Sequence, residues 1–353
     1  MNIVTSYFIE LYRATLAGWN RFWFTPADCA TLSMIRILGG LMLLYTHAVW
    51  TLDLEAFFGR HSWVTREAAE LAGGPGSYAW SYFWLIDSPG LLWTVHVAGL
   101  VIIAMLVVGL FTRVTSVLSF LVVVAYAHRT PGALFGLDQI NAMLAMYLMI
   151  GSSGACYSLD RLIAMCRGRQ SYATPARSVS TNVAIRLIQL HMCVIYLAAG
   201  LSKLQGPAWW NGTALWGAFA NLEYQSLDMT WLAHHPILVN LMSHATLFWE
   251  ISFIALVWPR LTRPLVIAVA VPLHMGIAFS MGMITFGLVM LVGCLAFVSP
   301  ALVRGLVDGL LGRGPKQGAH PVFSASTTAT GRKKRSKRHS AVGATSRERL
   351  PPR

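Results

Sequence analysis

Apolar residues recur in long stretches between residues 25 and 311. A helix needs about 20 such residues to cross roughly 30 Å of hydrocarbon, because every backbone N–H and C=O must be hydrogen-bonded within the segment. The pattern predicts an all-α fold, a polytopic membrane bundle of about eight transmembrane helices. The predicted spans are 28–50, 90–111, 114–130, 138–157, 182–203, 236–258, 264–281 and 283–305.

The distribution of Lys and Arg between these stretches predicts the orientation. Short cytoplasmic loops are enriched in basic residues. An N-in, C-in arrangement places the basic loops on the inner side, and the loop 204–235, which has no Lys or Arg, on the outer side. The inner basic residues are Arg113, Arg161, Arg167, Arg169, Arg177, Arg260 and Arg263.

The two ends of the chain differ from this transmembrane region. Residues 1–24 mix Glu10, Arg13 and Arg21 with aromatic residues and lack a compact apolar segment with a cleavage site, which indicates an interfacial amphipathic helix. Residues 312–353 hold eleven Lys or Arg and one Glu, so they carry +10 of the formal net charge of +13. We predict a disordered basic tail that binds anionic lipid headgroups. RNA is not the expected partner.

Composition supports a multi-pass membrane protein, in the plasma or inner membrane if the chain is bacterial. Hydrophobic residues make up 56% of the sequence and charged residues only 12%, whereas soluble domains average roughly 25% charged residues. The five cysteines are dispersed and imply no disulfide framework. No metal-ligand spacing appears, and no metal is predicted.

Ionisable residues within the spans are functional candidates because charge is costly at bilayer depth. For His47, His96 and His244, a helix-to-helix hydrogen bond is the simpler interpretation. Arg36 and Glu250 are as readily a structural ion pair as a functional one. These five residues are therefore weak candidates.

Two residues are stronger candidates for chemistry. Lys203 closes the fifth span, where it either extends to the interface or, if desolvated to its neutral form, acts as a base. His274 lies between Pro272 and Gly276, and irregular helix at membrane depth usually lines a cavity.

Three motifs carry a resemblance to a known family. They are Y-L-A-A-G-L-S-K-L-Q-G-P-A-W-W-N-G-T-A-L-W at 196–216, L-H-M-G-I-A-F-S-M-G-M-I-T-F-G-L-V-M-L at 273–291, and G-L-D-Q-I-N at 136–141 followed by Y-S-L-D-R at 157–161. The chain resembles the HTTM superfamily, whose best-known member is the vitamin K-dependent gamma-carboxylase. It is similar to short bacterial members.

The resemblance implies oxygenation of a reduced quinone, with Lys203 as the initiating base and His274 at the position of a later histidine. Ser202 replaces a second lysine of the carboxylase, and the large lumenal region of that enzyme has no counterpart in these residues, so carboxylation of glutamate is not expected.

The leading hypothesis is an outward-facing quinone or lipid pocket. It comprises Lys203 and His274 with Asp138 and Asn141, and reduced quinone is the cofactor or substrate. Trp209 and Trp210 form either a substrate lid or interfacial anchors. The alternative hypothesis is a non-enzymatic binding or maturation partner of a secreted peptide or lipid. Transport is less favoured, because no matching broken helices occur in two repeated halves.

Overall fold

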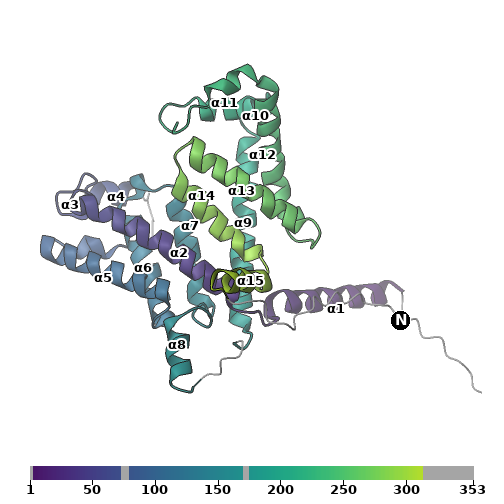
Figure 1. Cartoon of the computed structure of the whole chain (residues 1–353), viewed down its shortest axis with the longest axis horizontal. Coiled ribbons are helices and arrows are strands. Elements are labelled where there is room, and N and C mark those ends of the chain that lie inside the picture. Colours follow the sequence, from purple (N-terminus) through teal and green to yellow (C-terminus); the bar gives the residue numbers. More distant parts are fainter. Residues whose placement is uncertain (1–2, 73–78, 170–174, 313–353) are drawn as a thin grey trace, which may run out of the picture. The chain divides into compact units, whose positions relative to one another are not determined.

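The computed structural model describes residues 3–72, 79–169 and 175–312, and within these ranges the protein is all-α (Figure 1). The predicted fold class is therefore confirmed, whereas the predicted disorder of the basic tail lies outside the described residues. The long helices are α1 (Ile3–Phe24), α2 (Ala30–Val49), α5 (Pro89–Val108), α6 (Thr112–Arg129), α7 (Gly136–Ile150), α9 (Val179–Lys203), α12 (Pro236–Leu256), α13 (Arg263–Ser280), α14 (Ile284–Cys294) and α15 (Pro300–Leu310).

Short helices fill the connections between them. They are η1 (Trp50–Asp53), α3 (Leu54–Phe58), α4 (Arg66–Ala72), η2 (Tyr82–Leu85), η3 (Pro131–Ala133), α8 (Leu159–Cys166), α10 (Pro207–Trp210), α11 (Ala214–Phe219), η4 (Thr230–His234) and η5 (Leu295–Phe297).

Five helical segments of the described chain are long and apolar enough to cross a membrane. They are α2 with its continuation to Phe58, α5, α9, α12 and α13. The other predicted spans correspond to α6, α7 and α14, of which α7 and α14 have 15 and 11 residues. The protein is thus a helical membrane protein. The total of eight spans and the orientation remain predictions. "Outer" and "inner" below refer to that predicted orientation.

Two helix groups share α2 and α7 (Figure 1). One apolar core lies between α2, α7, α9, α12, α13 and α14, and a second lies between α2, α3, α5, α6 and α7. Close approach depends on small residues, since lipid gives helices no hydrophobic reason to associate. A Cβ on Gly40 would lie 3.0 Å from a Val107 methyl, and one on Gly200 would lie 2.7 Å from the Ile251 side chain.

Two predicted spans end earlier than their apolar stretches. The prediction 138–157 is too long, because α7 stops at Ile150 and the chain turns at Gly151, where a Cβ would lie 2.3 Å from Leu32. The prediction 283–305 is also wrong at its end. After α14 and η5, Ser299 caps a separate helix, α15, which begins at Pro300, a residue that cannot supply the N–H needed to continue the preceding helix.

The inner ends of α2 and α7 are joined by polar and covalent contacts. The fully buried Arg36 donates to the Ser153 carbonyl at 3.1 Å and the Tyr157 carbonyl at 2.5 Å. Cys29 and Cys156 form a disulfide, so the expectation that none is present is wrong. Their separation of 127 residues leaves no spacing pattern by which sequence could pair them.

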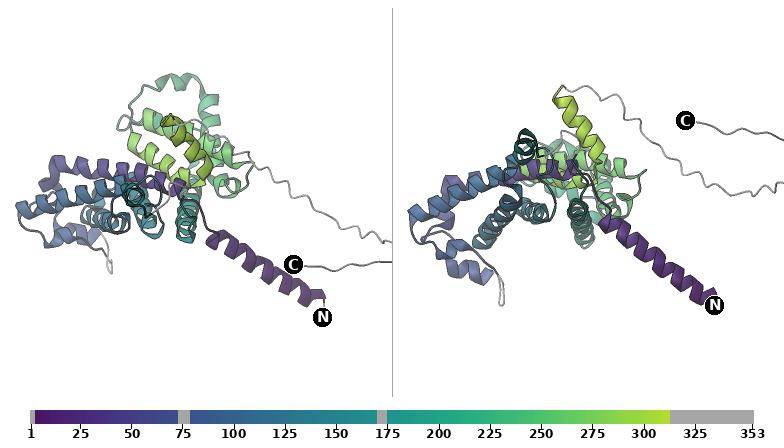
Figure 2. Two further views of the ribbon diagram at one scale, coloured as in Figure 1. Left: turned by 60° about the horizontal axis from the view of Figure 1, so that its bottom comes forward. Right: turned by 90° about the horizontal axis from the view of Figure 1, so that it is seen from below.

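Residues 3–24 form one uninterrupted helix, α1, and none of its side chains is buried (Figure 2). Its end is fixed to the start of α9, where Asn182 Nδ2 donates to the carbonyls of Phe22 and Trp23 at 2.7 and 2.8 Å. Arg186 also lies 4.4 Å from the centre of the Phe22 ring. The segment is thus helical over residues 3–24, and the interfacial amphipathic helix proposed for residues 1–24 stays a prediction.

Candidate functional site

A cavity with a volume of about 780 Å³ lies at the outer ends of α2, α7 and α14. Its wall is mainly aromatic and apolar, with a few polar side chains, which is the usual make-up of a small-molecule site. Its lining residues include Thr46, Trp50, Asp138, Thr285 and Phe286.

A small polar recess adjoins this cavity, and Thr46, Trp50 and Asp138 line both. The recess has a volume of about 20 Å³, which is room for one water molecule. His47 and Asn141 also line the recess, and both are more than nine-tenths buried. The cavity therefore combines a large apolar chamber with a narrow polar end.

Two acceptor atoms of the recess have no hydrogen-bond partner among the described residues. They are His47 Nε2 and Asn141 Oδ1. His47 Nδ1 lies 2.8 Å from the Leu43 carbonyl, so in a neutral ring Nδ1 carries the proton and Nε2 accepts. Asn141 Nδ2 donates to Thr46 Oγ1 at 3.3 Å, which assigns Oδ1 to the free position. The recess is therefore matched to a ligand group that donates hydrogen bonds.

A buried histidine and tyrosine support one side of the recess. Tyr126, which lines it, lies with its hydroxyl 2.5 Å from His96 Nδ1, and His96 Nε2 lies 2.8 Å from Thr51 Oγ1. The Tyr126 ring also packs 4.7 Å from the His47 ring. For His96 this is the helix-to-helix hydrogen bond expected from the sequence. His244 instead bonds within its own helix, to the Asn240 carbonyl.

Asp138 lies in the first turn of α7, where a carboxylate stabilises the positive end of the helix dipole. Its Oδ2 accepts from the Phe135 N–H at 2.9 Å. Asp138 and Asn141, both predicted to bind substrate, both line the recess. They lie about one helical turn apart on the same face of α7, which explains why sequence spacing alone could associate them.

Lys203 lies apart from the lining of this cavity. Its Nζ lies 2.9 Å from Glu250 Oε1 and 2.8 Å from Oε2, in a partly buried ion pair. The Trp209 ring covers the ammonium, with 5.4 Å between Nζ and the ring centre. Trp210 is 64% exposed and donates to the Leu204 carbonyl. The structural ion pair between Glu250 and Arg36, one of the two interpretations from the sequence, is not formed, because both carboxylate oxygens of Glu250 lie next to Lys203 Nζ.

His274 lies behind the cavity wall. Its Nε2 is 2.7 Å from the Tyr196 hydroxyl, which in turn is 3.3 Å from Cys294 Sγ. The ring of Phe286, a wall residue, is centred 6.4 Å from the imidazole. The residues predicted as one site thus occupy three places: Asp138 and Asn141 at the cavity, His274 behind Phe286, and Lys203 in its ion pair.

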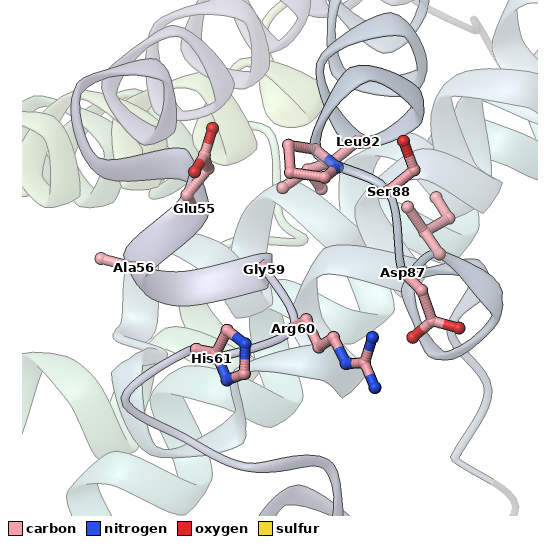
Figure 3. Close-up of a pocket in the computed structure, with 10 residues that line it drawn as sticks. Glu55, Ala56, Gly59, Arg60, His61, Asp87, Ser88 and Leu92 are labelled. Carbon is pink, nitrogen blue, oxygen red and sulfur yellow. The ribbon is translucent and has the colours of Figure 1, made fainter.

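A second outer cavity, of about 320 Å³, carries charges of both signs (Figure 3). Glu55 comes from α3, Arg60 and His61 from the turn after it, and Asp87 from the turn before α5. Glu55 accepts a hydrogen bond from Trp93 Nε1, at 3.0 Å. Among the described residues, no hydrogen bond or ion pair joins the side chains of Arg60 and Asp87. They are therefore free to contact a charged ligand.

Sequence reasoning missed the parts of the large cavity that come from distant segments. For His47 a structural hydrogen bond was the favoured interpretation, and Thr46, Trp50 and Phe286 were not among the candidates. No local signal distinguishes them, because polar and aromatic residues are common in apolar helices. No protein-family model, curated protein or solved structure matches this chain.

Proposed function

We propose that this chain is a membrane protein of the HTTM superfamily that binds a reduced quinone, or an amphiphile of similar chemistry, in the large outer cavity. The observation that carries the proposal is the join between an apolar chamber of about 780 Å³ and a recess with two unpartnered acceptors. The motifs at 196–216 and 273–291 support membership of the superfamily.

The hydrogen-bonding character of the recess favours the reduced form of such a ligand. A hydroquinone hydroxyl donates a hydrogen bond, so it satisfies His47 Nε2 or Asn141 Oδ1, whereas a quinone carbonyl only accepts. Leaving a buried acceptor unpaired costs about 1–3 kcal/mol. The ring and isoprenoid chain would occupy the apolar chamber, where Trp50 and Phe286 offer flat aromatic surface.

Binding is tested first, with a long-chain naphthohydroquinone and the purified protein in lipid nanodiscs under argon. Thr285→Trp fills the chamber and Asn141→Leu removes an acceptor, so each is expected to weaken binding about tenfold. Val97→Trp, at a 51% exposed position of α5, is the matched control and should bind as the wild type does. Equal affinity in the wild type and Thr285→Trp would exclude this cavity.

The catalytic form of the proposal is oxygen-dependent chemistry on the bound hydroquinone, with Lys203 as base and His274 as its partner. Lys203 does not line the cavity and its Nζ contacts Glu250, so it must leave that ion pair and approach the hydroquinone to act as a base. His47 Nε2 is an alternative base that lines the recess itself.

Turnover is tested by supplying oxygen and labelled bicarbonate and following quinone epoxide by chromatography. Loss of epoxide in Lys203→Ala with unchanged hydroquinone affinity supports Lys203 as the base. Loss in His47→Gln alone assigns that role to His47. If the wild type binds hydroquinone without any turnover, the protein is a binder and not an oxygenase.

The alternative function, a binding or maturation partner of a secreted peptide, is favoured by the charged outer cavity. Its carboxylates and its Arg60 guanidinium are suited to a peptide with charges of both signs. Reversing Arg60 and Asp87 together, to Glu and Lys, should deplete specific peptides from the culture medium, measured by mass spectrometry. An unchanged peptide profile would remove this candidate.

The basic tail is proposed to bind anionic headgroups. Removing residues 313–353 should weaken association of the detergent-solubilised protein with vesicles containing phosphatidylserine, and 0.5 M salt should have the same effect on the full chain. Equal association with neutral vesicles would contradict the proposal.

A further inference from the structure

The disulfide at the inner end of the bundle lies next to an ion pair. Cys29 precedes α2 and Cys156 lies between α7 and α8, and both are 2% exposed. Asp28 and Arg304 lie beside them, with 2.6 Å between Arg304 Nη2 and Asp28 Oδ1 and 3.5 Å between the same nitrogen and Cys156 Sγ. The bond thus connects two helix ends next to a guanidinium.

The same end of the bundle carries the basic loops. Arg161 belongs to α8 and Arg167 follows it directly, Arg260 lies in the connection between α12 and α13, and Arg263 begins α13. By the distribution of basic residues, this end faces the cytoplasm. Cytoplasmic thiols are kept reduced, and the disulfides that do form there are mostly transient, either catalytic or redox-sensing. A permanent structural disulfide is not expected on this side.

A metal site is the competing interpretation, since ligand atoms of Asp28, Cys29 and Cys156 lie within 4.8 Å of one another. The position of Arg304 argues against it. Its guanidinium is already bound to the Asp28 carboxylate and adjacent to the Cys156 sulfur. A second cation in this space would be repelled by the first. Arg304 instead stabilises Cys156 in its thiolate form, as cations beside cysteines do.

We propose that Cys29 and Cys156 form a reversible redox site on the cytoplasmic face, which exchanges two electrons with a cytoplasmic dithiol. In reduction, one thiolate of the external dithiol attacks the Cys29 sulfur and the bond to Cys156 breaks, releasing the Cys156 thiolate beside Arg304. The second external thiolate then displaces Cys29. The protein gains two electrons and the external dithiol becomes a disulfide; of the two protons that the dithiol gives up, one goes to Cys29 and the other to water, since Cys156 stays a thiolate beside Arg304.

Access to the pair is controlled by α15. Val303 packs against both cysteines in a small apolar cluster, and the ion pair of Arg304 with Asp28 fixes the helix over them. α15 also carries exposed leucines, Leu302, Leu306 and Leu310. The external thiol must therefore displace α15 before it reaches the sulfurs. Weakening the ion pair should speed the exchange.

The experiment counts free thiols in the full chain in living cells. Cells are quenched in acid, the protein is denatured, and its thiols are tagged with a maleimide polymer that adds a fixed mass. The oxidised protein exposes Cys166, Cys193 and Cys294 and gains three tags, whereas the reduced protein gains five. We expect five tags in untreated cells, three within minutes of a membrane-permeant thiol oxidant, and five again after it is washed out.

Control variants separate the redox site from other causes. Cys29→Ser should gain four tags under every condition, because Cys156 then has no partner with which to form the disulfide. Asp28→Asn, which removes the ion pair but keeps Arg304 beside Cys156, should raise the exchange rate about threefold or more, and Arg304→Lys, which keeps the charge, should change it little. An unchanged or slower rate in Asp28→Asn contradicts the role of α15 as a cover.

Three results would overturn the redox site itself. Three tags that persist after a permeant reductant would indicate a permanent disulfide, and five tags throughout would mean that no disulfide forms. Reduction in intact cells by a reductant that does not cross membranes would place the pair on the outer face.

Discussion

Replacing Lys203 by methionine tests whether this residue has a structural role. The substitution keeps an unbranched side chain but removes the ammonium, which leaves the Glu250 carboxylate without its partner. Breaking a buried ion pair costs about 3–5 kcal/mol, because an uncompensated charge remains in a medium of low dielectric constant. The Lys203 side chain is 26% exposed and that of Glu250 is 9% exposed, so water can partly replace the ammonium.

We therefore expect a loss of about 2–3 kcal/mol in the free energy of unfolding for Lys203→Met. This should appear as a fall of roughly 3–4 °C in the midpoint of thermal unfolding, given the size of the chain. The double variant Lys203→Met with Glu250→Met removes both charges, and it should recover to within about 1 kcal/mol of the wild type. Lys203→Arg preserves the charge and serves as the control.

Circular dichroism at 222 nm in detergent, at one fixed scan rate, provides the measurement, because membrane proteins often unfold irreversibly. The reasoning is refuted if Lys203→Met unfolds at the wild-type temperature, or if the double variant loses the sum of the two single effects. In either case the pair contributes no coupling. An unchanged unfolding temperature together with lost quinone turnover would restore Lys203 as a dedicated base.

Other predictions follow from individual contacts. Arg36→Leu leaves the Tyr157 carbonyl without its donor and removes one of two donors to the Ser153 carbonyl, which keeps the Ser33 hydroxyl; it should cost about 1–3 kcal/mol, seen as protease cleavage in the segment 151–158. Asn182→Ala should release the end of α1 and raise hydrogen exchange at residues 22–25, with α12 unaffected as the internal reference. Gly200→Ala, whose Cβ meets Ile251, should cost about 1–3 kcal/mol, whereas Gly276→Ala, with open space around it, should not destabilise the protein.

The sequence predictions agree best with the structure for features that a single segment of the chain determines. The apolar stretches located α2, α5, α6, α9, α12 and α13 to within a few residues, since hydrocarbon thickness and backbone hydrogen bonding are local requirements. The two errors of length, after Ile150 and after Phe297, arose because apolar residues continue beyond the turns. Hydropathy indicates whether a residue lies in an apolar environment, but it does not show where a helix ends and the chain turns.

The candidate site was only partly predictable for a related reason. Asp138 and Asn141 share one turn of α7, so their association was visible in the sequence. Lys203 and His274 were linked to them by family resemblance, and the packing of α9 against α12 gives Lys203 a different partner, Glu250.

The sequence by itself therefore determined the class of protein, the approximate helices and the polar residues worth testing. These follow from composition and periodicity, which are properties of neighbouring residues. The tertiary structure decided which polar groups meet: His47 with Asn141 around the recess, and Cys29 with Cys156 across 127 residues. Helices in lipid can pack in many registers with similar apolar surfaces, so only the packing of small residues such as Gly40 and Gly200 selects one set of partners.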